Sequence, residues 1–326
     1  MVICSSGYRI ALDGKAKDSN VNFVSHAHSD HISGIKNGTA TFASEETRDL
    51  LLARYGITVK EEQMPKSIRL LNAGHILGSK QLYAETEDSG TIIYSGDYQV
   101  RDSLLSGRLE IKNAETLIID STYPYPDVSF DPCEEVLSNI QHLVKTKGQN
   151  RSIVFGAGCI GKAQELTKAL NEIGIQPIVD KRISDINGVY ERYGFRMDYF
   201  CIKDELPSGC NVFLSEPKNV KNIAAALSSN TGASPITAVV TGLANLYNFG
   251  YDFQFALSDH ADFNSAIEYI DGCSPKIIYT VGKEAVAFAH NLRTYGYNAY
   301  PAHNANKVER SSFGFSFASA ENRGKV

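Results

Sequence analysis

The sequence predicts an α/β protein in which a domain of alternating strands and helices interrupts a β-rich domain. Three observations carry this prediction. Short β-branched and aromatic runs dominate residues 1–125, strand and helix patterns alternate over residues 126–245, and strand-like runs return over residues 246–326. Alternation of strand and helix is typical of a parallel sheet with crossover helices. The inserted domain is therefore expected to be an α/β unit with a sheet of its own.

The first β-rich part consists of short runs bounded by Gly, Asn, Asp and Ser, which is the pattern of strands separated by tight turns. These runs are YRIALDG, VNFVSH, TATFAS, SIRLLNAG, KQLYAET, GTIIYSGD and TLIIDST. One helix interrupts them, because Leu50, Leu51 and Tyr55 recur at helical spacing. Ser44 is positioned to cap the start of this helix and Gly56 to end it.

The inserted part begins with a helix behind Asp131 and Pro132, where Asp131 is expected at the N-cap and the proline in the first turn. The strand-like runs SIVFGA, QPIVD, NVFLSE and ITAVVTG follow. Helices are expected between and after them at about residues 162–173, 185–193 and 219–227. The last part is predicted to hold the strand FQFALSDH, a helix capped by Asp262, the strand KIIYTVG and a final helix.

The composition is that of a globular protein, with 326 residues, 43% hydrophobic and 21% charged residues and a net charge of −5. No apolar run approaches the roughly 20 residues of a membrane helix, and no secretory signal is visible, so a cytoplasmic enzyme is expected. The six cysteines lie far apart, which argues against a zinc knuckle and a disulfide framework. The negative charge argues weakly against a nucleic-acid binder, although a cleft can be basic inside an acidic protein.

The densest group of metal-ligating side chains is the stretch VSHAHSDHISG, which holds His26, His28, Asp30 and His31 within six positions. His26 and His28 alternate at period two, so they share one side of an extended strand end, and the other two follow in a turn. Imidazole and carboxylate are ligands that zinc prefers. The stretch is therefore predicted to hold one metal ion or two.

Further ligands are expected to be distant in sequence and close in space. His75 in LNAGHILGS and Asp97 in IIYSGD both stand at the ends of strand-like runs, where loops build sites on a rigid sheet. Asp97 is a natural bridge, since its two oxygens can contact two cations. Asp13 in IALDGK is suited to orient one of the histidines through a hydrogen bond.

These residues together resemble a known family. The pattern HxHxDH, a later Gly-His and a later Gly-Asp, in this order and at strand ends, resembles the metallo-β-lactamase fold. LIIDSTY and LSDHAD resemble two further motifs of the β-CASP nucleases, in which an α/β cap domain interrupts the metallo-β-lactamase core. Within that group, AGHILGSKQ, SGDYQ, GKAQEL, NGVYERYG and LSDHADF are most similar to the exonucleases associated with DNA ligases. The resemblance runs from about residue 13 to 284 and implies an αββα sandwich with an inserted cap.

The resemblance also implies two metal sites. One would consist of three imidazoles, the other of a carboxylate and an imidazole, and a carboxylate would bridge the two. In that order, the implied ligands are His26, His28 and His75, then Asp30 and His31, then Asp97. Bound metal ions would activate water and neutralise charge on phosphate oxygens. Asp30 and Asp97 are therefore expected to be catalytic as well as ligands.

The β-CASP motifs imply an acid–base pair beside the metal sites. Asp120 in LIIDSTY would pair with His260 in LSDHAD, and His260 would contact the scissile phosphate or protonate the leaving oxygen. A histidine held by a carboxylate is suited to act as a general acid. Four catalytic residues are thus predicted: Asp30, Asp97, Asp120 and His260.

One position departs from the family pattern. The nucleases carry a histidine in a third motif, after the strand that follows SDHAD, and it completes the second metal site. Here Val281 stands in its place in IIYTVGKEA, and valine cannot ligate. One tightly held zinc and a weaker second site, open to Mn²⁺ or Mg²⁺, are therefore predicted. Valine is a feature of DNA-processing members such as Artemis, so it favours DNA over RNA; reduced activity and replacement of the ligand by His303 are the alternatives.

Substrate contacts are expected on the cap and near the motifs. GAGCIGKA matches the first part of a nucleotide P-loop, but Ala163 replaces the Ser or Thr that would hold magnesium. Lys162 is instead predicted to contact a substrate phosphate at a helix N-terminus, and Ser258 in LSDHAD to be a second contact. Two or three contacts are also expected among the basic residues near presumed cleft loops, which are Lys80, Arg101, Lys181, Arg182, Lys218 and Lys283.

The sequence therefore predicts a metal-dependent nuclease that hydrolyses phosphodiester bonds, namely a DNA exonuclease in repair or end processing. The resemblance further implies a DNA ligase or a helicase as a partner, and no membrane. An RNA-processing nuclease of the same build is the nearest alternative. A small-molecule metallo-hydrolase and an inactive scaffold are further alternatives; the cap with DSTY and SDHAD argues against the first, and the six intact ligands argue against the second.

Overall fold

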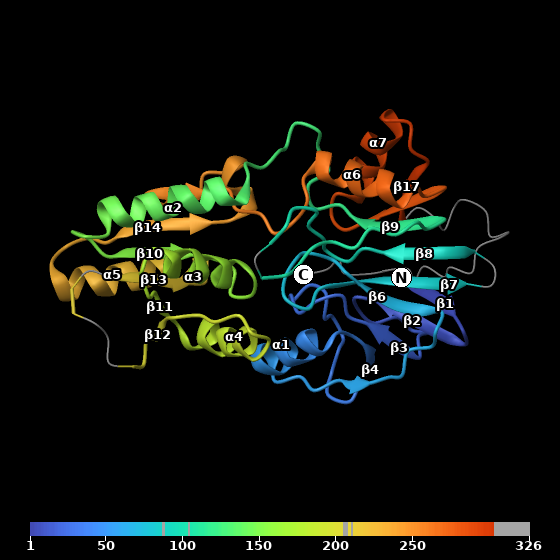
Figure 1. The fold of residues 1–326 in the computed structure, drawn as a ribbon, viewed down its shortest axis with the longest axis horizontal. Helices are drawn as coiled ribbons and strands as arrows, with labels where there is room; N and C mark the ends of the chain where they lie inside the picture. The colour runs from blue at the N-terminus through green and yellow to red at the C-terminus, as the bar shows by residue number, and fades with distance from the viewer. Residues whose placement is uncertain (87–88, 104, 205–207, 210, 303–326) are drawn as a thin grey trace, which may run out of the picture. The chain divides into compact units, whose positions relative to one another are not determined.

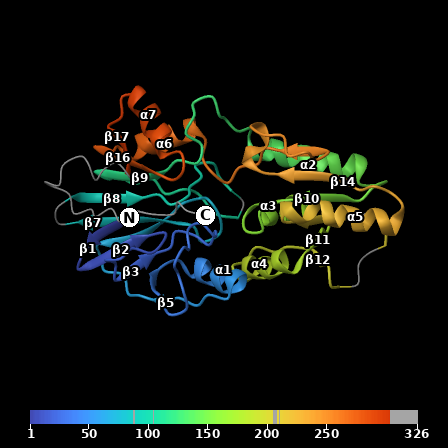
Figure 2. The same ribbon diagram turned by 180° about the vertical axis from the view of Figure 1, so that it is seen from behind.

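The structure is a computed structural model that describes residues 1–86, 89–103, 105–204, 208–209 and 211–302 (Figures 1 and 2). The chain forms two compact units. The first unit comprises Met1–Leu52, Gly56–Ser129 and His260–Val326, and the second comprises Ala53–Tyr55 and Phe130–Asp259. The second unit is thus an insertion that the chain enters after Ser129 and leaves before His260.

Two sheets form the centre of the first unit. The five-stranded sheet has the order β1-β2-β3-β4-β5, with β1 (Val2–Ser5), β2 (Tyr8–Leu12), β3 (Val21–Phe23), β4 (Ala40–Phe42) and β5 (Lys60–Glu61). The six-stranded sheet has the order β17-β16-β9-β8-β7-β6, with β6 (Ile68–Asn72), β7 (Lys80–Thr86), β8 (Gly90–Tyr94), β9 (Thr116–Asp120), β16 (Ile277–Val281) and β17 (Ala299–Pro301). β6 to β8 form an antiparallel meander, and β8, β9, β16 and β17 are parallel.

Alternation along the strands of the six-stranded sheet builds two cores. Ile92 and Ile118 face the five-stranded sheet, where they pack with Phe23 in the core of the sandwich. The next residues along, Ile93 and Ile119, point to the opposite face. There they pack against α6 (Phe263–Cys273) and α7 (Ala285–Thr294), which lie beside β9 and β17 in Figure 1. Each face of the six-stranded sheet is therefore buried by a partner layer.

The helix α1 (Glu45–Tyr55) follows β4 and confirms the predicted start and stop signals. The Ser44 side chain accepts a hydrogen bond from the Thr47 backbone N–H at 3.1 Å, and Gly56 ends the helix in the left-handed conformation, with φ of 67°. Leu50 and Leu51 are buried, as their spacing predicts. The predicted helix capped by Asp262 is likewise confirmed as α6, because the Asp262 side chain accepts from the Ser265 N–H.

The second unit is built around a six-stranded parallel sheet of order β12-β11-β13-β10-β14-β15. Its strands are β10 (Ile153–Gly156), β11 (Ile178–Val179), β12 (Phe200–Cys201), β13 (Val212–Ser215), β14 (Ile236–Val240) and β15 (Phe253–Phe255). Its helices are α2 (Cys133–Lys147), α3 (Lys162–Glu172), α4 (Lys181–Arg192) and α5 (Val220–Thr231), with the 3-10 turns η1 (Pro217–Asn219) and η2 (Gly242–Asn245). The predicted α/β insertion with a parallel sheet is confirmed.

Two helix starts differ from the sequence prediction. Pro132, not Asp131, is the N-cap of α2, because its extended ψ of 136° places it just before the first turn. The helix α4 begins at Lys181, four residues before the predicted start near residue 185. Asp180, the last residue of QPIVD, caps it by accepting from the Ile183 N–H at 3.0 Å. The N-cap of α2 thus lies one residue after the predicted one, and the N-cap of α4 is the last residue of a run predicted to be a strand.

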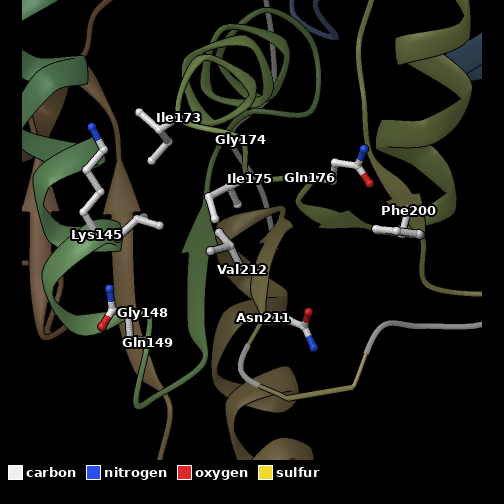
Figure 3. A pocket seen from close by; sticks show the side chains of 11 residues that line it. Lys145, Gly148, Gln149, Ile173, Gly174, Ile175, Gln176, Phe200, Asn211 and Val212 are labelled. Atoms are coloured by element: carbon white, nitrogen blue, oxygen red, sulfur yellow. The ribbon is translucent and has the colours of Figure 1, made fainter.

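Two further features concern the helices and the second unit. None of the helices in the described parts of the chain combines the length and the apolar character needed to cross a membrane. The second unit contains a cavity of about 650 Å³ at the amino ends of its strands, lined by apolar groups such as Ile175 and Val212 and by polar groups such as Lys145 and Asn211 (Figure 3). It contains none of the residues that the sequence predicts to be functional.

Candidate metal centre and acid–base pair

Two of the predicted ligands, His75 and Asp97, lie at one sheet edge because they follow strands that run in the same direction. β8, β9 and β16 are parallel neighbours, and β6 runs parallel to β8 across the meander. The carboxyl ends of these strands therefore meet at one edge of the six-stranded sheet. Asp120 and Val281 are the last residues of their strands and pair in register. His75 and Asp97 follow β6 and β8 at the same edge.

Two glycines allow the loops that bear these ligands to pack closely. Gly74, just before His75, has φ of 72°, and a Cβ atom there would lie 2.3 Å from the Gln99 carbonyl oxygen. Gly96, just before Asp97, has φ of 55°, and a Cβ atom there would lie 2.5 Å from the Ser25 Cβ. The Gly-His and Gly-Asp pairs are therefore required by the local geometry, since only glycine fits both the backbone conformation and the space.

The first group consists of His26, His28, His75 and Asp97, each of which offers one ligand atom within 4.8 Å of the others. Nε2 of His26 and Nε2 of His75 lie 3.4 Å and 3.7 Å from the Oδ2 of Asp97. Nε2 of His75 also lies 3.2 Å from Nδ1 of His28. Three of the four side chains are buried, and His28 is half-buried. The structure therefore brings together the three predicted imidazoles and the predicted bridge.

The second predicted group shares the other oxygen of Asp97. Nε2 of His31 lies 3.2 Å from the Oδ1 of Asp97 and 3.8 Å from the Oδ2 of Asp30. The Asp30 side chain is 77% exposed, so this group is open to solvent on one side. Asp97 thus presents Oδ2 to the first group and Oδ1 to His31. This is the arrangement that a bridging carboxylate requires.

Asp13 is linked by hydrogen bonds to both ligand groups, to His26 through Ser25 and to His31 directly. Its Oδ2 accepts hydrogen bonds from the Ser25 hydroxyl at 2.6 Å, the Tyr94 hydroxyl at 2.8 Å and the Nδ1 of His31 at 2.7 Å. Its Oδ1 accepts from the Ser25 backbone N–H at 2.7 Å. Asp13 also has a positive φ of 42°, which is uncommon for a residue with a side chain. The predicted orienting role of Asp13 thus agrees with its contacts, which extend beyond a single histidine.

Ser25 fixes the tautomer of His26. Its hydroxyl proton is donated to Asp13, so its oxygen accepts the Nδ1–H of His26 at 3.0 Å. Nε2 of His26 then carries a lone pair; it is buried, and among the described residues it has no hydrogen-bond partner. Burial, followed by the neighbouring imidazoles, lowers the pKa of His26 well below its ordinary value, so this ring stays neutral. A lone pair and a carboxylate oxygen therefore face each other with no proton between them.

This donor set fits a metal ion. Two buried acceptors at 3.4 Å repel each other unless a cation lies between them. Neutral imidazoles and a carboxylate are ligands that zinc and similar divalent ions prefer. At the second group, burial alone would lower the pKa of His31, but its bonds with Asp13 and Asp97 raise it to about 11. That position therefore favours a positive charge, which a metal ion would also supply.

His260 and Asp120 form a pair next to the first group. Nδ1 of His260 lies 3.7 Å from the Oδ2 of Asp120, and its Nε2 lies 3.8 Å from the Oδ2 of Asp97. Burial alone would raise the pKa of Asp120, but the contact with His260 and the hydrogen bonds from Thr122 lower it. Asp120 is therefore held as a carboxylate on one side of the His260 ring, while the opposite nitrogen faces the metal-ligating groups.

The loop that carries Asp97 also holds the loop that carries His260. The Gln99 side-chain N–H donates to the His260 carbonyl oxygen at 2.8 Å, and the Ala261 N–H donates to the Tyr98 carbonyl at 2.9 Å. A third link joins Arg101 to the carboxylate of Asp262 at 3.2 Å. The position of His260 relative to Asp97 is therefore fixed by the backbone and by the Gln99 side chain.

Val281 lies where the sequence predicts it, at the end of β16 beside Asp120. Its carbonyl oxygen accepts a hydrogen bond of 2.5 Å from the Ser121 hydroxyl, and its side chain packs against the sandwich core. It offers methyl groups and no ligand atom. The proposed substitute, His303, lies outside the described residues.

The two substrate contacts that are predicted individually, Lys162 and Ser258, belong to the second unit. Lys162, the first residue of α3, forms an ion pair with the buried carboxylate of Asp259. Ser258 is half-buried next to Asp259 in the same motif. The charge of Lys162 is therefore already opposed by a carboxylate, and its contact with a phosphate stays a prediction.

Sequence reasoning misses three positioning residues, Ser25, Tyr94 and Gln99. Ser25 and Gln99 stand inside the ligand motifs, directly before His26 and two positions after Asp97, and this adjacency is the signal that could have found them. Tyr94 lies in a buried strand next to isoleucines, and its hydroxyl contact with Asp13 spans 81 positions. No local pattern reveals a contact of that separation.

The fold and the site together define the class of this protein as a two-sheet α/β sandwich with a cluster of residues at the sheet edge that could hold a metal ion. No family model matches the chain. A solved structure of a protein of unknown function from Enterococcus faecalis V583 superimposes with a TM-score of 0.57 at 15% identity, covering 84% of this chain and 78% of that one. This likeness concerns the fold alone.

Sequence relatives narrow the class. The chain is 27% identical over 303 residues to a probable DNA ligase of Opitutus terrae, covering 88% of this chain but only 29% of that relative. It is 26% identical over 178 residues to the DNA cross-link repair 1A protein of Mus musculus, covering 49% of this chain and 17% of that one. It is 29% identical over 192 residues to an RNase J-like protein of Methanocaldococcus jannaschii, covering 49% and 45%. These similarities confirm the resemblance of the chain to the β-CASP nucleases of the metallo-β-lactamase fold. The meaning given to Val281 stays a prediction, and the chain spans less than half the length of each of these relatives.

Proposed function

We propose that the chain is a metal-dependent nuclease that hydrolyses phosphodiester bonds of nucleic acid, with DNA favoured over RNA. The single observation that carries this proposal is the division of Asp97, whose Oδ2 faces the three imidazoles while its Oδ1 faces His31. A carboxylate shared in this way suits two cations placed side by side, the arrangement used by many enzymes that transfer phosphoryl groups.

The roles of the residues follow from their geometry. His26, His28, His75 and Asp97 would hold one metal ion, most favourably zinc, and Asp97, His31 and Asp30 a weaker second ion such as zinc, Mn²⁺ or Mg²⁺. When bound, the ions supply an activated water and neutralise charge on the phosphate oxygens. Asp13 and Ser25 keep the imidazole lone pairs directed toward the ligand positions.

His260 is assigned the general acid. Its Nδ1 faces Asp120, so the carboxylate stabilises the charged imidazolium, and a proton on Nε2 is held on the side of the metal-ligating groups. Transfer of this proton to the leaving oxygen would complete the cleavage. Asp120 then positions the ring and keeps its charge, as the lowered pKa of Asp120 supports.

The preference for DNA, the exonuclease mode and a role in repair or end processing rest on the relatives and on Val281. One relative is named a probable DNA ligase and another a DNA cross-link repair protein. A DNA ligase, or a helicase, is accordingly proposed as a partner, and the cytoplasm as the location. The RNase J-like relative supports the alternative of an RNA-processing nuclease.

One assay tests this function. End-labelled single- and double-stranded DNA and RNA of matched sequence are incubated with the protein and with Zn²⁺, Mn²⁺ or Mg²⁺. We expect DNA to be shortened from one end in a metal-dependent reaction that EDTA stops. Faster cleavage of RNA than of DNA would favour the alternative. Absence of cleavage of every substrate with every metal would refute the proposal.

The two metal sites are expected to differ in affinity. The first group has three imidazoles and a share of Asp97, whereas the second has Asp97, His31 and the exposed Asp30, and Val281 adds nothing. Even the loss of a group that supports a ligand typically weakens metal binding by about 10- to 100-fold. Purified protein should therefore retain about one equivalent of metal by mass spectrometry of the metal content, and added divalent metal should raise its activity.

Replacing Val281 by His supplies the missing ligand type and should raise the retained metal toward two equivalents. Val281→Leu is the matched control, since it changes the side chain without adding a ligand atom, and it should retain the same metal as the natural protein. If the natural protein already holds two equivalents after dialysis against a mild chelator, another ligand fills the second site and this account of Val281 is wrong.

A further inference from the structure

Three cations converge on one carboxylate in the second unit. Glu216 follows β13, and its Oε1 lies 3.0 Å from a guanidinium nitrogen of Arg54. Its Oε2 lies 2.8 Å from Arg182 and 3.3 Å from Lys218. We call Arg54, Arg182 and Lys218 the cation triad. Burial alone would raise the pKa of Glu216, but the triad lowers it, so the carboxylate stays ionised and carries one charge against three.

Arg182 and Lys218 of the triad lie at the carboxyl edge of the parallel sheet, which is where such sheets bind ligands. β11 and β13 are parallel neighbours, with Val179 in register with Leu214, so the chain that follows each strand emerges at the same edge. Arg182 lies in the first turn of α4, which follows β11, and Lys218 lies in η1, which follows β13. Ligands of open α/β sheets bind outside the carboxyl ends of the strands. The cavity of Figure 3 lies at the opposite, amino-terminal edge.

The triad is held in place and remains accessible. The Tyr251 hydroxyl donates to the Pro217 carbonyl at 2.9 Å, and the Asn219 N–H donates to the Glu216 carbonyl at 2.9 Å, so the turn that bears Lys218 is fixed. Glu216 is nearly buried, with 15% of its side chain exposed, whereas Arg182 and Lys218 are 56% and 64% exposed. Arg54 is only 16% exposed, so it supports the carboxylate from the protein side, while Arg182 and Lys218 present their outer donors to solvent.

The three cations of the triad share a single carboxylate, whereas the neighbouring Lys181 has a carboxylate of its own. Lys181 precedes Arg182 in the same helical turn, but its Nζ forms an ion pair with both oxygens of Asp185, at 2.7 Å and 2.9 Å. That pair is neutral, whereas the triad and Glu216 together carry a surplus of two positive charges in a chain whose net charge is −5. A concentrated positive charge on an acidic protein attracts anions.

We propose that the cation triad around Glu216 is a binding site for phosphate groups of the nucleic-acid backbone, separate from the groups that would hold the metal ions. Guanidinium groups suit phosphate because their planar donors match two of its oxygens. A fixed carboxylate behind them presents the donors in one orientation before the strand arrives. This inference rests on the proposed function and adds a contact that positions the strand and reads no base.

The test compares substitutions that each remove one positive charge. Arg182→Gln, Lys218→Gln and the double variant are measured against Lys181→Gln, which removes a charge already paired with Asp185. A fluorescent single-stranded DNA with phosphorothioate linkages, which resists cleavage, is titrated at several salt concentrations and followed by anisotropy. We expect each triad variant to bind about 10-fold more weakly, as for removal of a charged hydrogen bond. The slope of log affinity against log salt should fall by about 0.7 for each phosphate that a variant no longer neutralises.

The Lys181→Gln variant should bind as the natural protein does, and all variants should keep the natural melting temperature, since the substituted side chains are exposed. A second arm titrates inorganic phosphate by calorimetry. Binding of phosphate that depends on Arg182 while the DNA affinity of Arg182→Gln is unchanged would show a site for free phosphate and overturn the proposal.

Three other results would also overturn it. Equal decreases of affinity in Lys181→Gln and Arg182→Gln would show that only the overall charge matters. Natural affinity in the double variant, with cleavage of nucleic acid by the natural protein intact, would overturn the triad alone and leave the proposed function standing. A natural protein that neither binds nor cleaves nucleic acid would refute both.

Discussion

Replacement of Asp97 by Asn is expected to abolish hydrolysis of nucleic acid while the protein still folds. The substitution keeps the size of the side chain, but the amide has one oxygen where the carboxylate presents Oδ2 to His26 and His75 and Oδ1 to His31. It also removes the negative charge that two cations would share. Loss of several kcal/mol of charge stabilisation corresponds to a rate decrease of about 10³-fold or more.

The measurement pairs turnover of an end-labelled oligonucleotide with metal content and a melting curve. Retained metal should fall in Asp97→Asn, because both sites lose a ligand, while the melting transition should remain cooperative. Asp18→Asn is the matched control, since Asp18 is an exposed aspartate with a distant Arg9 partner at 3.9 Å, and both readouts should be unaffected. Full activity in Asp97→Asn would remove Asp97 from the mechanism and with it the main support for the proposed function.

Replacement of His260 by Ala should slow turnover by about 10²-fold or more, the scale of a missing general acid, with metal content unchanged. The reason is its geometry: His260 contacts Asp120 on one side and approaches Asp97 at 3.8 Å on the other. His260, Asp97 and Asp120 also have ligand atoms within 4.8 Å of one another, so the set could hold a metal ion, and metal content has to be measured beside turnover.

The comparison of metal content with turnover decides the role of His260. His290→Ala, which changes an exposed histidine of α7, is the control and should alter neither readout. If His260→Ala loses metal in proportion to its activity, His260 is a ligand and the assignment of the general acid is wrong. If it keeps both metal and turnover, another group protonates the leaving oxygen.

Much of the fold is visible in the sequence because buried elements carry strong patterns. The runs GTIIYSGD and TLIIDST, which form β8 and β9 in the middle of the six-stranded sheet, are recognisable from their β-branched residues. The strands that sequence reasoning misses, β1, β5, β12 and β17, all lie at the edges of their sheets. An edge strand pairs with one neighbour only and buries less apolar surface, so its alternation is weak.

The ligand groups are predictable for a similar reason. Polar residues that end apolar strands, such as His75 and Asp97, stand out from their surroundings, and parallel strands carry them to one edge. The network behind them is only partly predictable. Tyr94 of one sheet contacts Asp13, which follows a strand of the other sheet, and the three cations around Glu216 come from segments as far apart as residues 54 and 218. Contacts of this kind depend on how the chain folds in three dimensions and leave no periodic trace in the sequence.

The hydrogen bonds of Asp13 have a consequence for how the protein would lose and rebind metal ions. They join the segments that bear Ser25, His31 and Tyr94 through protein atoms, so the proposed ligand residues have links that do not depend on a bound ion. A chelator should then strip the ions without unfolding the chain, and reloading should need no refolding. The metal ion bound to the protein would accordingly depend on which divalent ions are available around it. A change in their concentrations would alter the activity of protein molecules that are already folded.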